Sequence, residues 1–245
     1  MFKDYPLIVA ANRDEHYDRP SAPPALLNTQ PAIIAGRDLR ANGTWLGVNE
    51  YGLIAGVLNR RFDGRQLSAS EARSRGLLCM DVLNFDSGRA SNEFIQGHRF
   101  RYNPFSLLFA DGHEAYVSYN DEQKIITEKL QTGLHVFSSA AEFEMHSTKA
   151  DRAYALFAKL STQVQPTNGK TLESIAALQT VLSDHSLVAD SNDPGDAICV
   201  HRESSGTVSS SVIYFSEAES RFYTFFCPGA PCRNSFGDAL KLDVR

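Results

Sequence analysis

Short apolar runs, separated by glycine, proline or charged residues, dominate the first half of the chain. Runs of about four to eight residues that are rich in valine, isoleucine and aromatic side chains predict strands, because a helix needs a longer periodic segment. The same pattern returns near the C-terminus. The predicted strands comprise residues 5–11, 33–36, 43–49, 53–59, 105–110, 114–119, 124–130, 135–139, 197–201, 207–216 and 221–227.

Four segments instead show apolar residues at helical spacing, which predicts helices with one buried face. The first follows Ser68 or Ser70, either of which is a suitable N-cap, with Glu71 in the first turn. The predicted helices comprise residues 68–84, 90–97, 148–160 and 171–182.

The turns between neighbouring strands favour antiparallel pairing. Gly52 closes the turn between residues 43–49 and 53–59, and Asp111-Gly112 lies between residues 105–110 and 114–119. Dipeptides of this kind are typical of hairpins. We therefore predict an α+β protein with antiparallel sheets and helices packed outside them. Glycines inside the predicted strands mark places where another backbone or a ligand approaches closely, and they are Gly36, Gly47 and Gly56.

Composition narrows the classes of protein. The chain has 245 residues, a formal net charge of −5 and four cysteines. The mildly acidic balance argues against a nucleic-acid partner. The first apolar run is short and leads directly into charged residues, so we expect neither a secretory signal nor a membrane span. We expect reduced thiols, a cytoplasmic location and a single domain over residues 1–245, while composition specifies no oligomeric state.

A charged cluster follows the first predicted strand, and we place it where the chain leaves the sheet. It contains Asn12, Arg13, Asp14, Glu15 and His16. One interpretation is a solvated strand end with local ion pairs, which are worth little. The other is a site for chemistry, since a strand fixes the backbone while its exit lets side chains reach a ligand.

A series of motifs resembles the NRDE family, also called the transport and Golgi organisation protein two family. The resemblance covers most of the chain, with specific matches in about the first third and looser ones later, such as Ile198-Cys199-Val200-His201. The specific motifs are Asn12-Arg13-Asp14-Glu15, Asp18-Arg19-Pro20, Pro23, Ala35-Gly36-Arg37-Asp38, Gly43-Thr44-Trp45-Leu46-Gly47-Val48-Asn49, Asn59-Arg60-Arg61 and Ser74-Arg75-Gly76.

The resemblance implies a four-layer helix–sheet–sheet–helix sandwich with two mostly antiparallel sheets, the fold of the N-terminal-nucleophile hydrolases. In such enzymes a terminal Cys, Ser or Thr attacks an amide, and its own α-amine is the base. Family members typically begin Met-Cys, followed by a strand. This sequence begins Met1-Phe2-Lys3-Asp4, so we expect the first strand of the family fold to be missing and assign no catalytic residue.

The resemblance nevertheless implies roles for the rest of such a site. Arg13 and Asp14 would orient a ligand carboxylate or steady one another. Asn12 and Asn59 would donate amide hydrogen bonds to an oxyanion, although capping of strand ends explains both equally well. Val208 stands where the family often has arginine, and we expect Asp14 to lack a positive partner from that position.

The family's implied role is haem trafficking. Haem iron accepts His, Cys or Met, and among seven histidines we favour His16, which follows the signature, and then His201. The carrier also needs an apolar slot with cations for the propionates. The candidate slot residues are Trp45, Phe62, Tyr17, Arg13, Arg19, Arg37, Arg60 and Arg61, although a core tryptophan and surface arginines remain the alternative.

The sequence therefore predicts a cytoplasmic carrier of a small hydrophobic anion, with haem as the transported ligand. The alternative is a cysteine amide hydrolase whose nucleophile lies upstream of Met1. We predict no metal site, because Cys227 and Cys232 make only half of one. The predicted ligand-binding residues are Asn12, Arg13, Asp14, His16, Arg19, Arg37, Trp45, Asn59 and Arg60.

Overall fold

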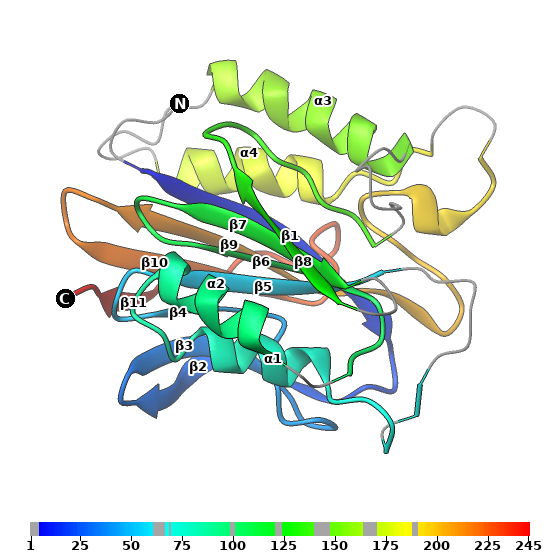
Figure 1. Cartoon of the computed structure of the whole chain (residues 1–245). Helices are drawn as coiled ribbons and strands as arrows, with labels where there is room; N and C mark the ends of the chain where they lie inside the picture. The colour runs from blue at the N-terminus through cyan, green and yellow to red at the C-terminus, as the bar shows by residue number, and fades with distance from the viewer. Residues whose placement is uncertain are drawn as a thin grey trace. The chain divides into compact units, whose positions relative to one another are not determined.

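The computed structural model describes residues 5–60, 67–68, 70–98, 101–120, 124–139, 148–163, 171–187 and 191–245. Over these residues the protein is α+β, with two antiparallel sheets and four α-helices (Figure 1). The backbone divides into two compact units. The first unit comprises residues 1–19, 133–219 and 223–241, and the second comprises residues 20–132, 220–222 and 242–245.

The second unit contains a seven-stranded antiparallel sheet in which every strand pairs with the next along the chain, in the order β2-β3-β4-β5-β6-β7-β8. Helices α1 and α2 pack on this sheet, α1 against β5 and β6 and α2 against β6, β7 and β8. The elements are β2 (Ser21–Thr29), β3 (Ala32–Asp38), β4 (Leu46–Asn49), β5 (Ile54–Asn59), α1 (Arg75–Val82), α2 (Gly88–Gly97), β6 (Phe105–Ala110), β7 (Ala115–Asn120) and β8 (Ile125–Leu130).

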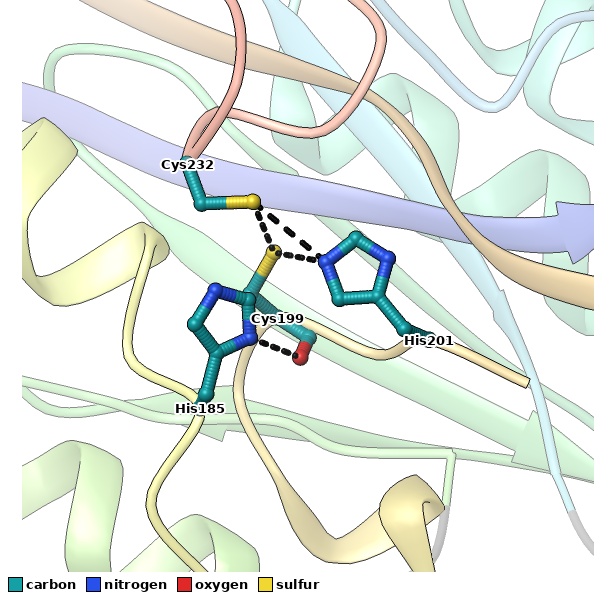
Figure 2. Close-up of side chains that lie close together, drawn as sticks. All are labelled: His185, Cys199, His201 and Cys232. Atoms are coloured by element: carbon teal, nitrogen blue, oxygen red, sulfur yellow. Dashed lines mark hydrogen bonds between the residues drawn. The ribbon is translucent and has the colours of Figure 1, made fainter.

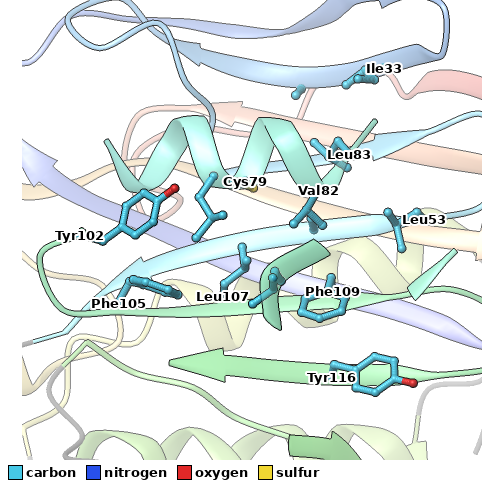
Figure 3. Packing of buried hydrophobic residues seen from close by; sticks show 14 residues of the cluster. Ile33, Leu53, Cys79, Val82, Leu83, Tyr102, Phe105, Leu107, Phe109 and Tyr116 are labelled. Atoms are coloured by element: carbon cyan, nitrogen blue, oxygen red, sulfur yellow. The ribbon is translucent and has the colours of Figure 1, made fainter. Parts of the chain in front are cut away.

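The core of the second unit lies between the two helices and the sheet (Figure 3). Alternate residues of β6, namely Phe105, Leu107 and Phe109, are almost completely buried. They meet Leu78 and Val82 of α1, which are also inaccessible to solvent. The period of two in the strand and the helical spacing in α1 place both apolar faces against each other.

The strand glycines have close neighbours, as the sequence predicts. A Cβ atom at Gly36 would lie 2.4 Å from the Trp45 ring, and one at Gly47 would lie 2.6 Å from the Cβ of Ala35. At Gly56 the nearest atom is Leu46 Cδ1, at 3.1 Å. The neighbours are therefore protein side chains, and Trp45 packs in the space that Gly36 leaves.

The first unit is built on a four-stranded antiparallel sheet in the order β1-β9-β10-β11. Helix α4 packs on β1 and β9, and α3 lies beside α4 (Figure 1). The helix–sheet core includes Ile175, Leu182, Val212, Tyr214 and Phe225. The elements are β1 (Leu7–His16), α3 (Thr148–Gln163), α4 (Thr171–Leu182), a 3₁₀ turn η1 (Pro194–Asp196), β9 (Ser205–Ser216), β10 (Arg221–Pro228) and β11 (Leu240–Asp243).

The predicted position of the charged cluster is wrong. Strand β1 does not end at Ala11 but continues through Asn12 and Asp14 to His16, paired with β9 and with a register shift between Arg13 and Asp14. The polar residues stay in the sheet because the facing stretch of β9 is also polar. Its residues Ser209, Ser210 and Ser211 supply small hydroxyl side chains.

Several predicted boundaries also need correction. Helix α1 begins at Arg75, because Glu71 bonds the backbone and hydroxyl of Ser68 in a separate turn. Residues 135–139 form no strand. Residues 197–201 contain only an isolated bridge between His201 and Gly206. No pattern in the sequence predicted β11, which is short and largely exposed.

Among the described residues, no helix is both long enough and apolar enough to cross a membrane. The antiparallel sheets and the helices that pack on them confirm the predicted α+β class. The backbone forms two compact units. Whether these make up the single domain predicted over residues 1–245 is not tested by this division, and that domain assignment stays a prediction.

Candidate functional site

Asn12 connects β1 to the C-terminal end of α4 and to the segment before β9, both in the first unit. Its side-chain amide donates to the carbonyl oxygens of Leu182, at 2.8 Å, and Ile198, at 2.9 Å. Its Oδ1 accepts a hydrogen bond of 2.5 Å from Ser210. An asparagine amide has two hydrogens, and both are engaged. Asn12 therefore acts as a structural bridge here, and donation to an oxyanion would require one of these bonds to break.

Asp14 has a positive partner, but not from β9. Thr207 donates to Asp14 Oδ1 at 2.6 Å, and Lys149 of α3 approaches Oδ2 at 3.3 Å. Lys149 also donates to the carbonyl of Gly195 at 3.4 Å, and its side chain is only 14% exposed. A lysine from another element thus supplies the positive charge beside Asp14 that position 208 does not.

The remaining signature residues surround one carboxylate. Glu15 lies 3.8 Å from Arg13 and 3.6 Å from Arg19. Arg13 is the more buried of the two, with 8% of its side chain exposed, against 26% for Arg19. His16 and Tyr17 are exposed at the end of β1. This arrangement leaves an imidazole, a phenol and a partly exposed guanidinium close together in the chain.

The other predicted ligand residues lie in the second unit. Arg37 is exposed and donates to Asn42 at 3.4 Å, while Asn59 is exposed at the end of β5. Arg60 donates to the carbonyl of Asn120 at 3.5 Å and lies over the Tyr119 ring. Trp45 packs at Gly36, as described above. Arg61, Phe62 and His146 lie outside the described residues.

A second group of reactive side chains lies in the first unit and comprises His185, Cys199, His201 and Cys232 (Figure 2). One possible ligand atom from each residue lies within 4.8 Å of all the others. The Sγ atoms of Cys199 and Cys232 are 3.7 Å apart. The Nε2 of His201 lies 3.7 Å from Cys199 Sγ and 3.3 Å from Cys232 Sγ. We call this group the thiol–imidazole cluster.

Hydrogen bonds to backbone carbonyls hold three separate segments together at the cluster. The Cys199 N–H donates to the carbonyl of Asp184, at 2.9 Å, which joins the residues after α4 to the segment before β9. Gln179 of α4 donates to the carbonyls of Pro231 and Asn234, at 2.8 and 3.0 Å. Cys232 lies between these two residues. Helix α4 therefore carries the chain to His185 at its C-terminal end and also holds the turn that contains Cys232.

Burial and neighbouring charge change the acidity of the cluster. Burial, together with the neighbouring Cys232 thiol, raises the pKa of Cys199 to about 12. Burial is also the main reason why the pKa of His201 is lowered, with Arg233 and His185 adding to the effect and Asp14 opposing it. The neutral Cys199 thiol and the neutral His201 imidazole are thus favoured.

The cluster adjoins the signature strand through Thr207. The Thr207 hydroxyl donates to Asp14 and accepts from the N–H of Val200, which lies between Cys199 and His201. Sequence reasoning missed the cluster because its members come from three segments that are far apart in the chain. The only local signal was the Cys199-Val200-His201 spacing. Cys227, which the sequence analysis considered beside Cys232 as half of a site, is not among the four.

Comparisons with known proteins agree with the motifs. The family model "Transport and Golgi organisation 2" matches residues 2–225. The mouse protein named "Transport and Golgi organization 2 homolog" is 37% identical over 113 residues, and its human counterpart has the same identity over the same length. Each alignment covers 44% of this chain and 39% of the relative. The matched part therefore spans about two fifths of these relatives.

Solved structures show the same fold at low identity. Penicillin V acylase from Agrobacterium tumefaciens superposes with a TM-score of 0.56 and 14% identity, covering 89% of this chain and 78% of the acylase. A variant of conjugated bile acid hydrolase from Clostridium perfringens gives 0.52 and 12%, with coverages of 89% and 84%. An N-acylethanolamine-hydrolyzing acid amidase orthologue from Caenorhabditis elegans gives 0.52 and 15%, with coverages of 84% and 91%.

These likenesses confirm the N-terminal-nucleophile-hydrolase-like fold that the motifs implied. Identities below about 15% establish the fold and leave the chemistry open. The family match is of a different kind, because it extends over most of the chain and includes the signature strand. The chain belongs to the transport and Golgi organisation 2 family.

Proposed function

We propose that this protein binds and hands on a small hydrophobic anion, and that haem is this ligand. Family membership supports a family-type role. The observation that carries the proposal is the end of β1, where His16 and Tyr17 are exposed and Arg19 is partly exposed, directly after the anchored Asn12–Asp14 segment.

These three side chains match the chemistry of haem. An imidazole is a common axial ligand of haem iron. The Tyr17 ring, 51% exposed, offers an aromatic surface for the porphyrin. The Arg19 guanidinium suits a propionate, since it forms charge-assisted hydrogen bonds with carboxylates. One of its present contacts is with Glu15, at 3.6 Å, and a propionate would replace that contact.

The anchoring of the strand supports a binding role. A ligand is bound more tightly by side chains that are already fixed, because less conformational freedom is lost on binding. The hydrogen bonds of Asn12 and Asp14 hold the backbone just before His16 in the sheet. The end of β1 is therefore a rigid platform for exposed ligand-binding groups.

Haem titration followed by the Soret absorption tests the proposal. The wild-type protein should bind haem saturably, with one equivalent per chain. His16→Gln should weaken binding at least about tenfold, because the axial ligand is removed. The matched control is His113→Gln, which removes an exposed histidine of the second unit and should have no effect. Absence of saturable binding would overturn the proposal, and equal weakening by both substitutions would overturn the role of His16.

The fold likeness supports one alternative function, hydrolysis of linear amides. Penicillin V acylase, conjugated bile acid hydrolase and the acid amidase orthologue share the fold. The reaction requires a terminal cysteine upstream of Met1. The intact mass and N-terminal sequence of the protein from its own cells test for this cysteine. If it is present, thiol-dependent release of amine from N-acyl amides would support the enzyme, and no turnover would contradict it.

We also infer a cytoplasmic location and no nucleic-acid partner. The net charge of −5 supports the second inference, because nucleic-acid binding favours a basic surface. Fractionation of the source cells, and a shift assay with duplex DNA and RNA at low salt, test the two inferences separately.

A further inference from the structure

We propose that the thiol–imidazole cluster is a binding site for one Zn²⁺ ion, with His185, Cys199, His201 and Cys232 as its four ligands. The inference is independent of the haem proposal, because it uses neither His16 nor Arg19. Two sulfurs and two imidazoles form the Cys₂His₂ set that zinc prefers in closed structural sites.

The distances fit a tetrahedral site. Zn–S bonds of about 2.3 Å and Zn–N bonds of about 2.0 Å separate two sulfurs by about 3.8 Å, and a sulfur from a nitrogen by about 3.5 Å. The Cys199–Cys232 sulfur separation is 3.7 Å, and His201 Nε2 lies 3.7 and 3.3 Å from the two sulfurs. Three of the four ligands are therefore already at the spacing of a zinc site.

His185 completes the set with a small adjustment. Its ligand nitrogen lies no more than 4.8 Å from any of the other ligand atoms, so a shift of about 1 Å brings it to bonding distance. His185 is exposed and follows the C-terminal end of α4.

A hydrogen bond already sets the tautomer of His185. Its Nδ1 lies 3.2 Å from the carbonyl oxygen of Cys199, to which the protonated nitrogen donates (Figure 2). The proton on Nδ1 leaves the lone pair on Nε2 to bind a cation. Metal-binding histidines commonly donate their other ring nitrogen to a carbonyl or carboxylate in this way.

The site is walled on one side and open on the other. Cys199 is 1% exposed, whereas Cys232 and His185 are exposed. A cation can thus enter from solvent and lose most of its water at the buried sulfur. Binding displaces the two thiol protons, and two thiolates neutralise the charge of Zn²⁺.

A disulfide between Cys199 and Cys232 explains the cluster less well. The sulfurs would have to approach from 3.7 Å to about 2.05 Å, and two electrons would have to pass to an oxidant. A disulfide would also involve only the two sulfurs and neither of the imidazoles. His185 and His201, whose ring centroids are 4.9 Å apart, flank the same sulfurs, and only a shared cation uses all four groups.

The zinc would join three segments that the sequence keeps apart. These are the residues after α4, the segment that leads into β9, and the turn after β10. All four coordination positions are filled by protein, which is typical of structural zinc and leaves no place for a catalytic water. We therefore assign the ion the role of a clamp next to the Asp14–Thr207 bond.

Cobalt titration of the reduced, metal-stripped protein tests the proposal. One equivalent of Co²⁺ should give the visible bands of a tetrahedral site and a thiolate-to-cobalt charge-transfer band, and Zn²⁺ should displace it. Cys232→Ser and His201→Gln should each weaken Zn²⁺ binding at least about tenfold. The matched controls are Cys227→Ala and His113→Gln, which change a cysteine and a histidine outside the cluster, and both should bind like wild type.

Any one of four results would overturn the zinc site. The first is Co²⁺ binding without a thiolate band. The second is equal zinc affinity of Cys232→Ser and the wild type. Circular dichroism must first show that the two proteins are equally folded. The third is a Cys199–Cys232 disulfide in protein prepared under reducing conditions. Rapid alkylation of Cys232 that is unaffected by Zn²⁺ would also contradict it and would indicate a Cys–His nucleophile instead.

Discussion

Thr207 donates a hydrogen bond of 2.6 Å to Asp14, a residue 193 positions earlier in the chain. The same hydroxyl accepts from the N–H of Val200, at 2.9 Å. One side chain on β9 therefore satisfies a carboxylate of the signature strand and a buried backbone donor beside the thiol–imidazole cluster. This double contact links the signature strand to the segment that carries Cys199 and His201.

Removing the hydroxyl should destabilise the protein. Thr207→Val keeps the shape of the side chain but leaves Asp14 and the Val200 N–H each without this partner. A buried polar group that loses its partner costs about 1–3 kcal/mol, and we expect a decrease of this size in the free energy of unfolding in urea. Thr207→Ser retains the hydroxyl and is the control. Equal stability of Thr207→Val and the wild type would contradict the account.

Asn12→Asp tests the role of the asparagine bridge. The aspartate keeps the size of the side chain but replaces two donors with an acceptor that faces the carbonyls of Leu182 and Ile198. We expect a loss of at least about 2 kcal/mol in the free energy of unfolding, since both carbonyls lose a donor and face a negative charge. A variant that is as stable as the wild type at neutral pH would show that the bridge contributes little.

The apolar core of the second unit predicts a large effect of truncation. Leu107 is completely buried in β6 and packs in the cluster of Figure 3. Leu107→Ala should cost about 2–5 kcal/mol, because burial is lost and a cavity remains. Leu26 of β2 is 57% exposed, so Leu26→Ala should change the unfolding free energy by less than about 0.5 kcal/mol. Similar losses in the two variants would contradict the assigned packing.

His98 makes the stability of the protein sensitive to pH. Burial lowers its pKa, Arg73 lowers it further, and Asp81 opposes this. Its Nε2 lies 2.5 Å from the hydroxyl of Tyr102. As the pH falls through about 6.5, His98 becomes protonated in the unfolded chain before it does so in the folded protein. Stability should therefore decrease from about pH 7 downwards, until the lowered pKa of the folded state is reached.

The variant His98→Gln isolates this contribution, since glutamine does not titrate. Between about pH 7.5 and about pH 5.5, the wild type should lose more unfolding free energy than His98→Gln. The comparison uses urea unfolding of both proteins at each pH. A larger loss in the variant would show that protonation of His98 stabilises the folded state, contrary to the assigned environment.

The sequence predicted most elements because their patterns are local. Alternation in residues 105–110 and helical spacing in residues 171–182 match β6 and α4 closely. Residues 197–201 resemble a strand in composition, but their backbone bonds with Asp184 and Thr207 leave only one bridge. Composition cannot show which partner a segment meets, so this prediction was wrong.

The candidate site was harder to predict because it depends on contacts between distant residues. The signature was recognisable from Asn12 to Glu15, whereas the partner of Asp14 is Lys149 of α3. Cys232 was compared with its sequence neighbour Cys227, although the fold brings it to Cys199. Pairing between residues 33 positions apart leaves no periodic signal in one sequence. The haem-binding role of His16, Arg19 and the other predicted ligand residues stays a prediction.

The most direct test of the account measures where haem binds. Hydrogen–deuterium exchange of the wild-type protein, with and without one equivalent of haem, reports on each backbone segment separately. We predict slower exchange in peptides that cover residues 12–19 and in the paired residues 205–210 of β9, and a much smaller change in His16→Gln. Protection confined to the second unit, or no protection at all, would contradict a ligand site at the end of β1.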